Sequence, residues 1–357
     1  MSPLRQFLDT PPQTVCLLRL SAIGDACHTL ALLRALETAW PKTRFTWIIG
    51  KVEHKLLSLV PNVEFISYDK RGGLTEFRRL RRVLSGRRFD LLMHLQVALR
   101  ASLISTLVRA PVKLGFDGER ARELQWLFTT DRIPATPRQH VLDGLLSFAA
   151  AVGVHDVAPR WDLPLPPAAR AYADRLIPDA RPTLVISACS SHAQRNWRAE
   201  HYATIADYAV AAHGMRVILC GGPGLAERSM ADAILAACRR PIVDQVGKDT
   251  LPELLALLAR ADVLLTPDSG PAHMATMVGL PVVGLYAATN PARSGPYLSR
   301  ASCVDRYAEA ARSFLGRSPE ELPWTTKIER PGVMDLITPL DVMGRLDSLR
   351  RAPLRRR

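Results

Sequence analysis

The chain has 357 residues, of which 47 are Lys or Arg and 34 are Asp or Glu, so its formal net charge is +13. A hydrophobic content of 48% is globular, and the length suits two domains better than one. Six scattered cysteines follow neither a disulfide nor a zinc spacing, and no apolar run reaches the roughly 20 residues of a membrane span. The first residues lack the apolar core of a signal peptide. Composition therefore predicts a cytosolic protein with reduced cysteines.

The basic charge predicts an anionic partner: nucleic acid, acidic lipid headgroups or phosphorylated sugars. Arginine dominates over lysine, which favours bidentate contacts with phosphate or carboxylate. The alternative is that arginine only reflects the codon usage of a GC-rich genome. No basic platform interleaved with aromatic residues is present, so nucleic acid is the least favoured partner.

The first half of the chain alternates apolar strands with helical patterns, which predicts a doubly wound parallel sheet. The predicted strands are residues 14–20, 44–49, 63–67, 89–95 and 112–114. The predicted helices between and after them are residues 28–39, 53–59, 74–84, 98–108 and 141–151. These elements form a predicted N-terminal domain of residues 1–160.

A proline-rich segment, residues 161–182, is predicted to be an interdomain linker with one short helix. The alternation then restarts in a second domain, residues 183–330, with strands at 183–187, 215–220, 263–266 and 281–286. Its predicted helices are residues 200–213, 225–237, 252–259 and 273–278. Residues 331–357 are predicted to form a final helix and a basic tail. The sequence alone thus predicts two α/β domains.

The most informative stretch is residues 261–297, which is predicted to be strand, tight turn, helix, strand and loop. Asp268, Ser269 and Gly270 form the turn, and a helix follows. The N–H groups at the start of such a helix suit a phosphate or diphosphate. An ordinary turn in which Asp268 or Ser269 caps the helix explains the spacing equally well.

Two separated motifs carry a family resemblance. The run from Asp268 to His273, with Pro281, Asn290-Pro291 and Gly295-Pro296-Tyr297 after it, resembles the C-terminal signature of glycosyltransferase family 9. These are the heptosyltransferases of lipopolysaccharide core synthesis. Residues 18–25 (LRLSAIGD) with residues 28–30 (HTL) resemble the family's N-terminal motif. The resemblance covers residues 14–297. It implies a GT-B fold, two Rossmann-like domains facing across a cleft that holds the active site, with the last helix packing back on the first domain.

Asp25 follows Gly24 after the first predicted strand, where open α/β sheets bind ligands. From the residues alone, a helix N-cap is the better explanation of this aspartate. The resemblance instead implies that Asp25 is the general base. Inverting sugar transfer needs a carboxylate that takes the proton of the acceptor hydroxyl.

The resemblance also implies a donor site in the second domain. Its phosphate loop corresponds to Ser190, Ser191 and Arg195, the last of which replaces a lysine of many members and joins Asp25 as a candidate catalytic residue. The second anion-binding turn adds Asp268, Ser269, Gly270 and His273, and Gly24 completes the donor set. A polar surface loop is the alternative for residues 189–197. Some members carry a ribose-binding glutamate after the glycine-rich turn; here Leu225 stands at that place and Glu227 follows two residues later.

The acceptor is expected on the first domain. Arginines are dense between residues 78 and 88, and Arg78 and Arg81 are candidate acceptor contacts together with Arg100, Arg122 and His140; Arg120 matches a neighbouring basic position. A solvated helix face is the alternative for any single arginine of the dense run. Lipopolysaccharide inner core is rich in phosphate and Kdo carboxylates, which arginine binds well.

The sequence is thus identified as an inverting glycosyltransferase that moves heptose from ADP-heptose to the Kdo-bearing lipid A core. The expected partners are the nucleotide-sugar donor, the anionic core acceptor and the inner-membrane surface, with no nucleic acid. No obligatory metal or other cofactor is predicted, because no His or Cys pair has ligand spacing. The alternatives are a relative that uses another nucleotide sugar, and a basic nucleotide-binding protein without transfer activity. A nicotinamide enzyme is disfavoured because the first strand–helix turn has one glycine.

Overall fold

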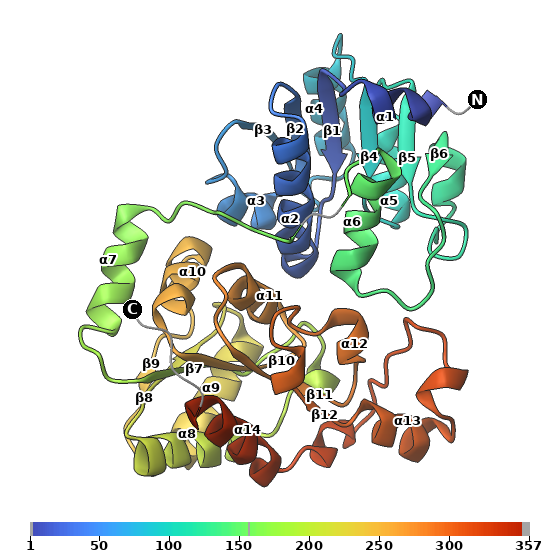
Figure 1. Cartoon of the computed structure of the whole chain (residues 1–357). Helices are drawn as coiled ribbons and strands as arrows, with labels where there is room; N and C mark the ends of the chain where they lie inside the picture. Colours follow the sequence, from blue (N-terminus) through green and yellow to red (C-terminus); the bar gives the residue numbers. More distant parts are fainter. Residues whose placement is uncertain (1–2, 156–157, 352–357) are drawn as a thin grey trace. The chain divides into compact units, whose positions relative to one another are not determined.

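The computed structural model describes residues 3–155 and 158–351. The chain divides into two compact units, Met1–Pro164 and Leu165–Arg357. Each unit is an α/β structure built on a parallel six-stranded sheet, so the predicted fold class is confirmed (Figure 1). No helix in the described ranges is both long enough and apolar enough to cross a bilayer.

The sheet of the first unit has the strand order β3-β2-β1-β4-β5-β6, and every neighbouring pair is parallel. Its β1, β2 and β4 are almost wholly buried, as expected for strands with helices on both faces. The strands are β1 (Thr14–Leu18), β2 (Arg44–Gly50), β3 (Val63–Tyr68), β4 (Leu91–His94), β5 (Val112–Gly115) and β6 (Asp131–Arg132).

Helices cover both faces of this sheet, with α2 and α6 packed against each other on one face. Leu80 and Leu84 of α4 share a core cluster with Ala101 and Ile104 of α5, so these two helices cover the other face. The helices are η1 (Pro3–Arg5), α1 (Gln6–Asp9), α2 (Ile23–Ala39), α3 (Lys51–Leu57), α4 (Gly73–Leu84), α5 (Leu99–Ser105), η2 (Gln125–Phe128) and α6 (Val141–Ala151).

The second unit repeats the architecture with the strand order β12-β11-β10-β7-β8-β9, again parallel throughout. Its strands are β7 (Thr183–Ser187), β8 (Arg216–Cys220), β9 (Val243–Asp244), β10 (Val263–Pro267), β11 (Val282–Tyr286) and β12 (Val304–Asp305). The short strands β6, β9 and β12, of two residues each, extend the edges and were not predicted.

The helices of the second unit are α7 (Pro167–Leu176), η3 (Ala193–Arg195), α8 (Ala199–His213), α9 (Leu225–Ala237), α10 (Leu251–Arg260), α11 (Gly270–Met277), α12 (Pro291–Ser294), η4 (Arg300–Ser302), α13 (Tyr307–Leu315), η5 (Pro319–Glu321), η6 (Val333–Leu336) and α14 (Pro339–Arg351). The short helix expected in the linker is α7, which packs on α10. The final helix α14 was expected to return to the first domain. The contacts that the structure gives it are with α8, β11 and β12, and Val342 and Leu346 are buried in the core of the second unit.

Trp197 ties the C-terminal segment to this core. Its side chain is 1% exposed, and its indole N–H donates to the Ile337 carbonyl at 2.9 Å. The ring also packs edge-on against Tyr202 at a centroid distance of 5.3 Å. A buried carbonyl that loses its donor carries its full desolvation cost, so this hydrogen bond fixes the segment that follows α13.

We therefore expect Trp197→Phe to lower the stability of the second unit by about 1–3 kcal/mol, the cost of an unsatisfied buried carbonyl. The measurement is urea unfolding followed by circular dichroism. Trp126→Phe is the control, because Trp126 is 46% exposed and an exposed substitution changes stability by only about 0.5 kcal/mol. Equal midpoints for the two variants would contradict the assignment.

Candidate functional site

Strand order reverses at one point in each sheet, and the predicted site residues lie there. In the first unit β1 lies between β2 and β4, and in the second unit β7 lies between β10 and β8. Loops that leave the carboxyl ends of neighbouring strands diverge at such a point and leave room for a ligand. Asp25 follows β1, Arg195 follows β7 and Asp268 follows β10. The topology thus places all three residues where open α/β sheets bind ligands.

Asp25 lies in the first turn of α2, which begins at Ile23, five residues earlier than predicted. The Ala22 N–H donates to Asp25 Oδ2 at 3.4 Å, a weak contact with the residue before the helix. The side chain is 31% exposed, whereas Gly24 beside it is buried. Asp25 is therefore a partly exposed carboxylate at the carboxyl end of β1, a position that suits either a cap or a base.

Arg19 is the main partner of Asp25, a role that no pattern in the sequence indicates. Its Nη2 forms an ion pair with Asp25 Oδ2, and its Nη1 donates to the Leu95 carbonyl at the end of β4. The guanidinium is largely buried, with a side-chain exposure of 11%. The buried guanidinium of Arg19 therefore fixes the position of the Asp25 carboxylate, part of which stays exposed to solvent.

A buried polar network supports this arrangement. The Leu20 N–H donates to Gln96 Oε1 at 2.8 Å, and Gln125 Nε2 donates to the His94 carbonyl at 2.9 Å. His94 Nε2 lies 3.2 Å from Ser102 Oγ. Burial and, to a smaller extent, the charges of Lys113 and Arg19 together lower the pKa of His94 to about 3. The imidazole is therefore neutral at neutral pH and acts as a structural hydrogen-bonding group.

Four of the five predicted acceptor contacts are accessible. Arg78 and Arg81 lie on the outer face of α4, Arg100 on α5, and Arg122 in the loop before η2, and all four are exposed. His140 differs, because it is 2% exposed and caps α6: its Nδ1 accepts from the Leu142 N–H at 3.0 Å. The structure therefore gives His140 a capping role inside the unit.

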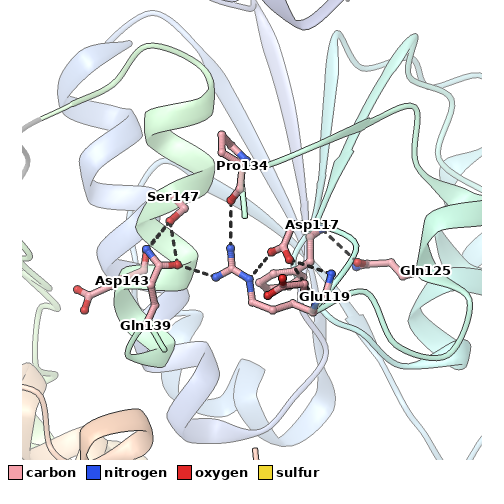
Figure 2. Close-up of polar contacts among 9 residues, drawn as sticks. Asp117, Glu119, Gln125, Pro134, Gln139, Asp143 and Ser147 are labelled. Atoms are coloured by element: carbon pink, nitrogen blue, oxygen red, sulfur yellow. Dashed lines mark hydrogen bonds and ion pairs between the residues drawn. The ribbon is translucent and has the colours of Figure 1, made fainter. Parts of the chain in front are cut away.

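Arg120 also has a structural role. Its guanidinium pairs with Asp117, donates to Gln139 Oε1 at 2.7 Å and reaches the Pro134 carbonyl at 3.4 Å. Figure 2 shows Asp117, Pro134 and Gln139 gathered around one guanidinium, with Ser147 of α6 beyond Gln139. Ser147 and Gln139 exchange hydrogen bonds at 3.2 and 3.4 Å, so Arg120 anchors its loop to α6.

In the second unit the structure brings the two predicted phosphate loops together. Ser190 Oγ, in the loop after β7, donates to the Asp268 carbonyl after β10 at 2.7 Å. The Ser190 N–H is held by Asn196 Oδ1 at 2.7 Å, and Ser294 Oγ lies 3.5 Å from Asp268 Oδ2. Ser191 is exposed at the tip of the same loop. The loops therefore form one site rather than separate surface turns.

Arg195 lies at the centre of this site, between two carboxylates. Its Nε and Nη2 donate to Glu329 Oε1 at 2.8 and 2.6 Å, and its Nη1 lies 3.6 Å from Asp268 Oδ2. Burial alone would raise the pKa of Glu329, but the hydrogen bond from Arg195 and its charge bring the pKa below the usual value. Glu329 was missed because it lies 134 residues further along the chain, in a segment without periodic pattern.

The turn at Ser269 keeps its helix N-terminus open. Ser269 is the N-cap of α11, yet its hydroxyl lies 2.8 Å from Thr266 Oγ1 and makes no capping hydrogen bond. Gly270 begins the helix, and His273 follows in the first turn with 8% exposure. Because Ser269 does not cap the helix, this turn favours the anion-binding alternative over the simple cap.

The glycine-rich turn lies against the Glu227 carboxylate, which is close to Gly221 and Gly222. A Cβ added to Gly222 would lie 2.7 Å from Glu227 Oε2, so the carboxylate approaches this backbone closely. Burial raises the pKa of Glu227. Burial, followed by the charges of Glu253 and Glu227, also raises the pKa of Asp249 to about 7. Two partly buried carboxylates thus border this turn, and neither Glu227 Oε2 nor Asp249 Oδ2 has a hydrogen-bond partner in the described part of the chain.

In residues 3–155 and 158–351, no group of three His, Cys, Asp or Glu side chains is placed to hold a metal ion.

The comparisons with known proteins show the family of the chain. A family model for glycosyltransferase family 9 (heptosyltransferase) matches residues 77–322. The lipopolysaccharide core heptosyltransferase OpsX of Haemophilus influenzae is 41% identical over 338 residues, which are 95% of this chain and 97% of that protein.

Two solved structures share the fold. A glycosyl transferase family 9 protein from Veillonella parvula has a TM-score of 0.78 at 21% identity, covering 97% of this chain and 99% of its own. The Escherichia coli heptosyltransferase WaaC with ADP-2-deoxy-2-fluoro heptose has a TM-score of 0.65 at 22% identity, covering 78% of this chain and 90% of its own.

The two doubly wound units, each with polar loops at its switch point, have the GT-B fold. The chain belongs to glycosyltransferase family 9, the heptosyltransferase family. The resemblance drawn from residues 18–30 and 268–297 is thereby confirmed.

The raised pKa of Asp249 predicts a pH-dependent stability. A carboxyl whose pKa is about 7 when folded and 3.8 when unfolded stabilises the fold below pH 3.8, and this contribution is lost as pH rises through 7. Asp249→Asn removes the ionisable group. The variant should therefore be more stable than the parent at pH 8 and lose less stability between pH 4 and pH 8.

Thermal unfolding at both pH values measures this effect. Asp232→Asn is the matched control, since the Asp232 side chain is 66% exposed and pairs only with Arg228 on the surface. If Asp249→Asn and Asp232→Asn follow the same pH dependence, Asp249 is ionised in the folded protein at neutral pH.

Proposed function

We propose that this protein is an inverting heptosyltransferase that moves heptose from ADP-heptose to the Kdo-bearing lipid A inner core of lipopolysaccharide. Family membership and 41% identity to a lipopolysaccharide core heptosyltransferase support the class of reaction. The observation that carries the residue assignment is the joined pair of loops around Arg195 in the second unit. Asp25 at the corresponding switch point of the first unit supplies the second half of the chemistry.

The donor assignment follows from the charge of the leaving group. When the bond between the anomeric carbon and the diphosphate breaks, negative charge grows on the departing ADP, and fixed positive groups stabilise it. Arg195 is oriented by Glu329 through Nε and Nη2, which leaves Nη1 directed toward Asp268. The open N-terminus of α11 at Gly270 and the hydroxyls of Ser190 and Ser191 complete the proposed diphosphate site. His273 belongs to the same turn.

Glu227 is the proposed contact for the ribose. Its carboxylate lies at the glycine-rich turn, where backbone can approach a nucleotide closely. A carboxylate accepts hydrogen bonds from sugar hydroxyls, and Glu227 Oε2 has no hydrogen-bond partner among the residues that the structure describes. We propose that Glu227 makes the ribose contact from a place two residues beyond the family's usual one.

Asp25 is the proposed general base. As the acceptor oxygen attacks the anomeric carbon, its proton passes to the Asp25 carboxylate, and the diphosphate leaves from the opposite face with inversion. Arg19 holds Asp25 in place from the buried side, so Arg19 is a positioning residue. The reaction therefore balances: the acceptor hydroxyl loses one proton to Asp25, and ADP leaves with the electron pair of the broken bond.

The acceptor is proposed to contact Arg78, Arg81, Arg100 and Arg122 of the first unit, whose exposed guanidinium groups suit phosphate and Kdo carboxylates. Such an acceptor is anchored in a membrane, so we place the enzyme at the cytoplasmic surface of the inner membrane. Transfer of another sugar is the alternative within the family. A panel of nucleotide sugars with and without core lipid acceptor, read by nucleotide release, tests the donor.

Replacing Asp25 tests the base. We expect Asp25→Asn to fold and bind ADP normally, while kcat falls by about 10²–10⁴-fold, the usual contribution of a general base. The measurement is ADP release in the presence of acceptor, with calorimetric ADP binding as the control for the donor site. Near-parent kcat in the folded variant would make Asp25 a helix cap only.

Replacing Arg195 tests the donor site. We expect Arg195→Ala to weaken ADP binding about 10–100-fold, as for loss of a hydrogen bond to a charged group. Arg195→Lys is the matched variant, because many family members carry lysine there, and it should retain most of the affinity. Titration calorimetry with ADP decides the matter: an unchanged Kd in Arg195→Ala would place the diphosphate elsewhere.

A further inference from the structure

Five large apolar side chains gather on the surface of the first unit. α5 and η2 pack together, and between a third and three-fifths of the surface of each of these side chains is exposed. The group, called here the α5–η2 patch, consists of Leu99 (45% exposed), Leu103 (47%), Leu124 (53%), Trp126 (46%) and Leu127 (57%). Single exposed apolar residues are ordinary, but a cluster of this kind indicates a surface that binds a partner.

The patch is held by the fold rather than carried on a loose loop. Gln125, between Leu124 and Trp126, is fully buried. It donates to the His94 carbonyl at 2.9 Å and accepts from the Phe116 N–H at 3.1 Å. Leu124 itself has a left-handed backbone with φ of 60°, which a branched residue rarely adopts. The buried glutamine thus fixes η2, and its apolar neighbours are left outside.

The patch shares its side of the unit with the exposed arginines of α4. Leu80 of α4 and Ala101 of α5 lie in one core cluster, so both helices cover the same face of the sheet. Arg78, Arg81 and Arg82 are exposed on α4, and Arg100 lies between the two leucines of α5. One face of the unit therefore combines leucine, tryptophan and arginine.

The acidic groups near these helices do not neutralise that face. Glu76 is paired with Arg79 at 2.7 Å, and Glu64 with Arg87 at 2.6 Å. Glu123 Oε2 accepts the Leu99 N–H at 2.6 Å, and this exposed carboxylate keeps its charge, as does exposed Glu119. These two charges are outnumbered by five exposed arginines, namely Arg78, Arg81, Arg82, Arg100 and Arg122. Within the described residues, Arg78, Arg81 and Arg82 have no carboxylate partner, so the face is positively charged.

We propose that this face of the first unit docks on an anionic lipid bilayer. The α5–η2 patch enters the headgroup region, where tryptophan and leucine are favoured, and the arginines bind the anionic headgroups. Positive charge on the face disfavours a second copy of the chain as the partner, because two such faces repel. The inference deepens the proposed function, which requires a lipid-anchored acceptor near Arg100 and Arg122.

The test uses the full chain and vesicles of phosphatidylcholine with or without phosphatidylglycerol. The parent should cosediment with anionic vesicles and hardly with neutral ones. The triple variant Leu103→Ser, Trp126→Ser, Leu127→Ser should bind anionic vesicles at least tenfold more weakly. Val52→Ser, on α3, and Leu340→Ser, on α14, are matched controls because both side chains are exposed and lie outside the patch. They should bind like the parent.

Salt separates the two parts of the attraction. Added salt screens exposed charges, with a Debye length of about 8 Å at physiological ionic strength, but leaves apolar insertion largely unchanged. Parent binding should therefore fall only partly at high salt, whereas the triple variant should lose its residual binding. Neutralising Arg78, Arg81 and Arg82 should remove the salt-sensitive part.

Equal sedimentation of the parent and the triple variant overturns the proposal. A parent that is dimeric without lipid, together with a monomeric triple variant, also overturns it and makes the patch a self-association surface. Transfer to a deacylated, water-soluble core acceptor distinguishes this failure from that of the proposed function. The triple variant should match the parent on that acceptor and lose at least tenfold on vesicle-bound acceptor. If no variant transfers to the soluble acceptor, the proposed function fails, while vesicle binding still decides the docking surface.

Discussion

The reversal of strand order within each parallel sheet is the constraint on which the remaining structure depends. All strands of a parallel sheet end at the same edge. The loops that leave two neighbouring strands diverge only at the point where the strand order reverses. β1 and β4 make that point in the first unit, and β7 and β10 make it in the second. The topology alone brings Asp25, Ser190 and Asp268 to the carboxyl-terminal edges of their sheets, because they follow β1, β7 and β10.

At the carboxyl-terminal edge of each sheet an arginine forms an ion pair with a carboxylate. Arg19 pairs with Asp25 in the first unit, and Arg195 pairs with Glu329 in the second. The roles of the partners are opposite. In the first pair the buried arginine orients a partly exposed carboxylate, whereas in the second the carboxylate orients the cation proposed to meet the diphosphate. Each pair is mostly buried, so the geometry is fixed before a substrate arrives.

Much of the fold could be predicted because buried parallel strands are continuous apolar runs. β7, α6 and α9 begin and end at the predicted residues. The two-residue strands β6, β9 and β12 carry no such pattern. The start of α2 was also misplaced, because residues 23–27 resemble a turn when neighbouring contacts are unknown.

The site was predictable only where a motif marked it. Asp25, Arg195 and Asp268 belong to motifs, but the partners Arg19 and Glu329 are set by tertiary contacts over long sequence separations. His140 is the converse case: the resemblance assigns this basic residue to the acceptor, and the structure shows its ring capping α6. Sequence spacing does not reveal which polar side chains the fold uses internally.

The distance along the chain between Arg195 and Glu329 has a consequence for biosynthesis. The two residues are 134 positions apart, and Ile328 beside Glu329 belongs to the core of the second unit. At the ribosome's pace of about 5–20 residues per second, Arg195 emerges roughly 7–27 s before the carboxylate that will orient it. Asp268, whose Oδ2 lies 3.6 Å from Arg195 Nη1 in the folded protein, is synthesised before Glu329, so Arg195 can pair with this first carboxylate until the second one is made.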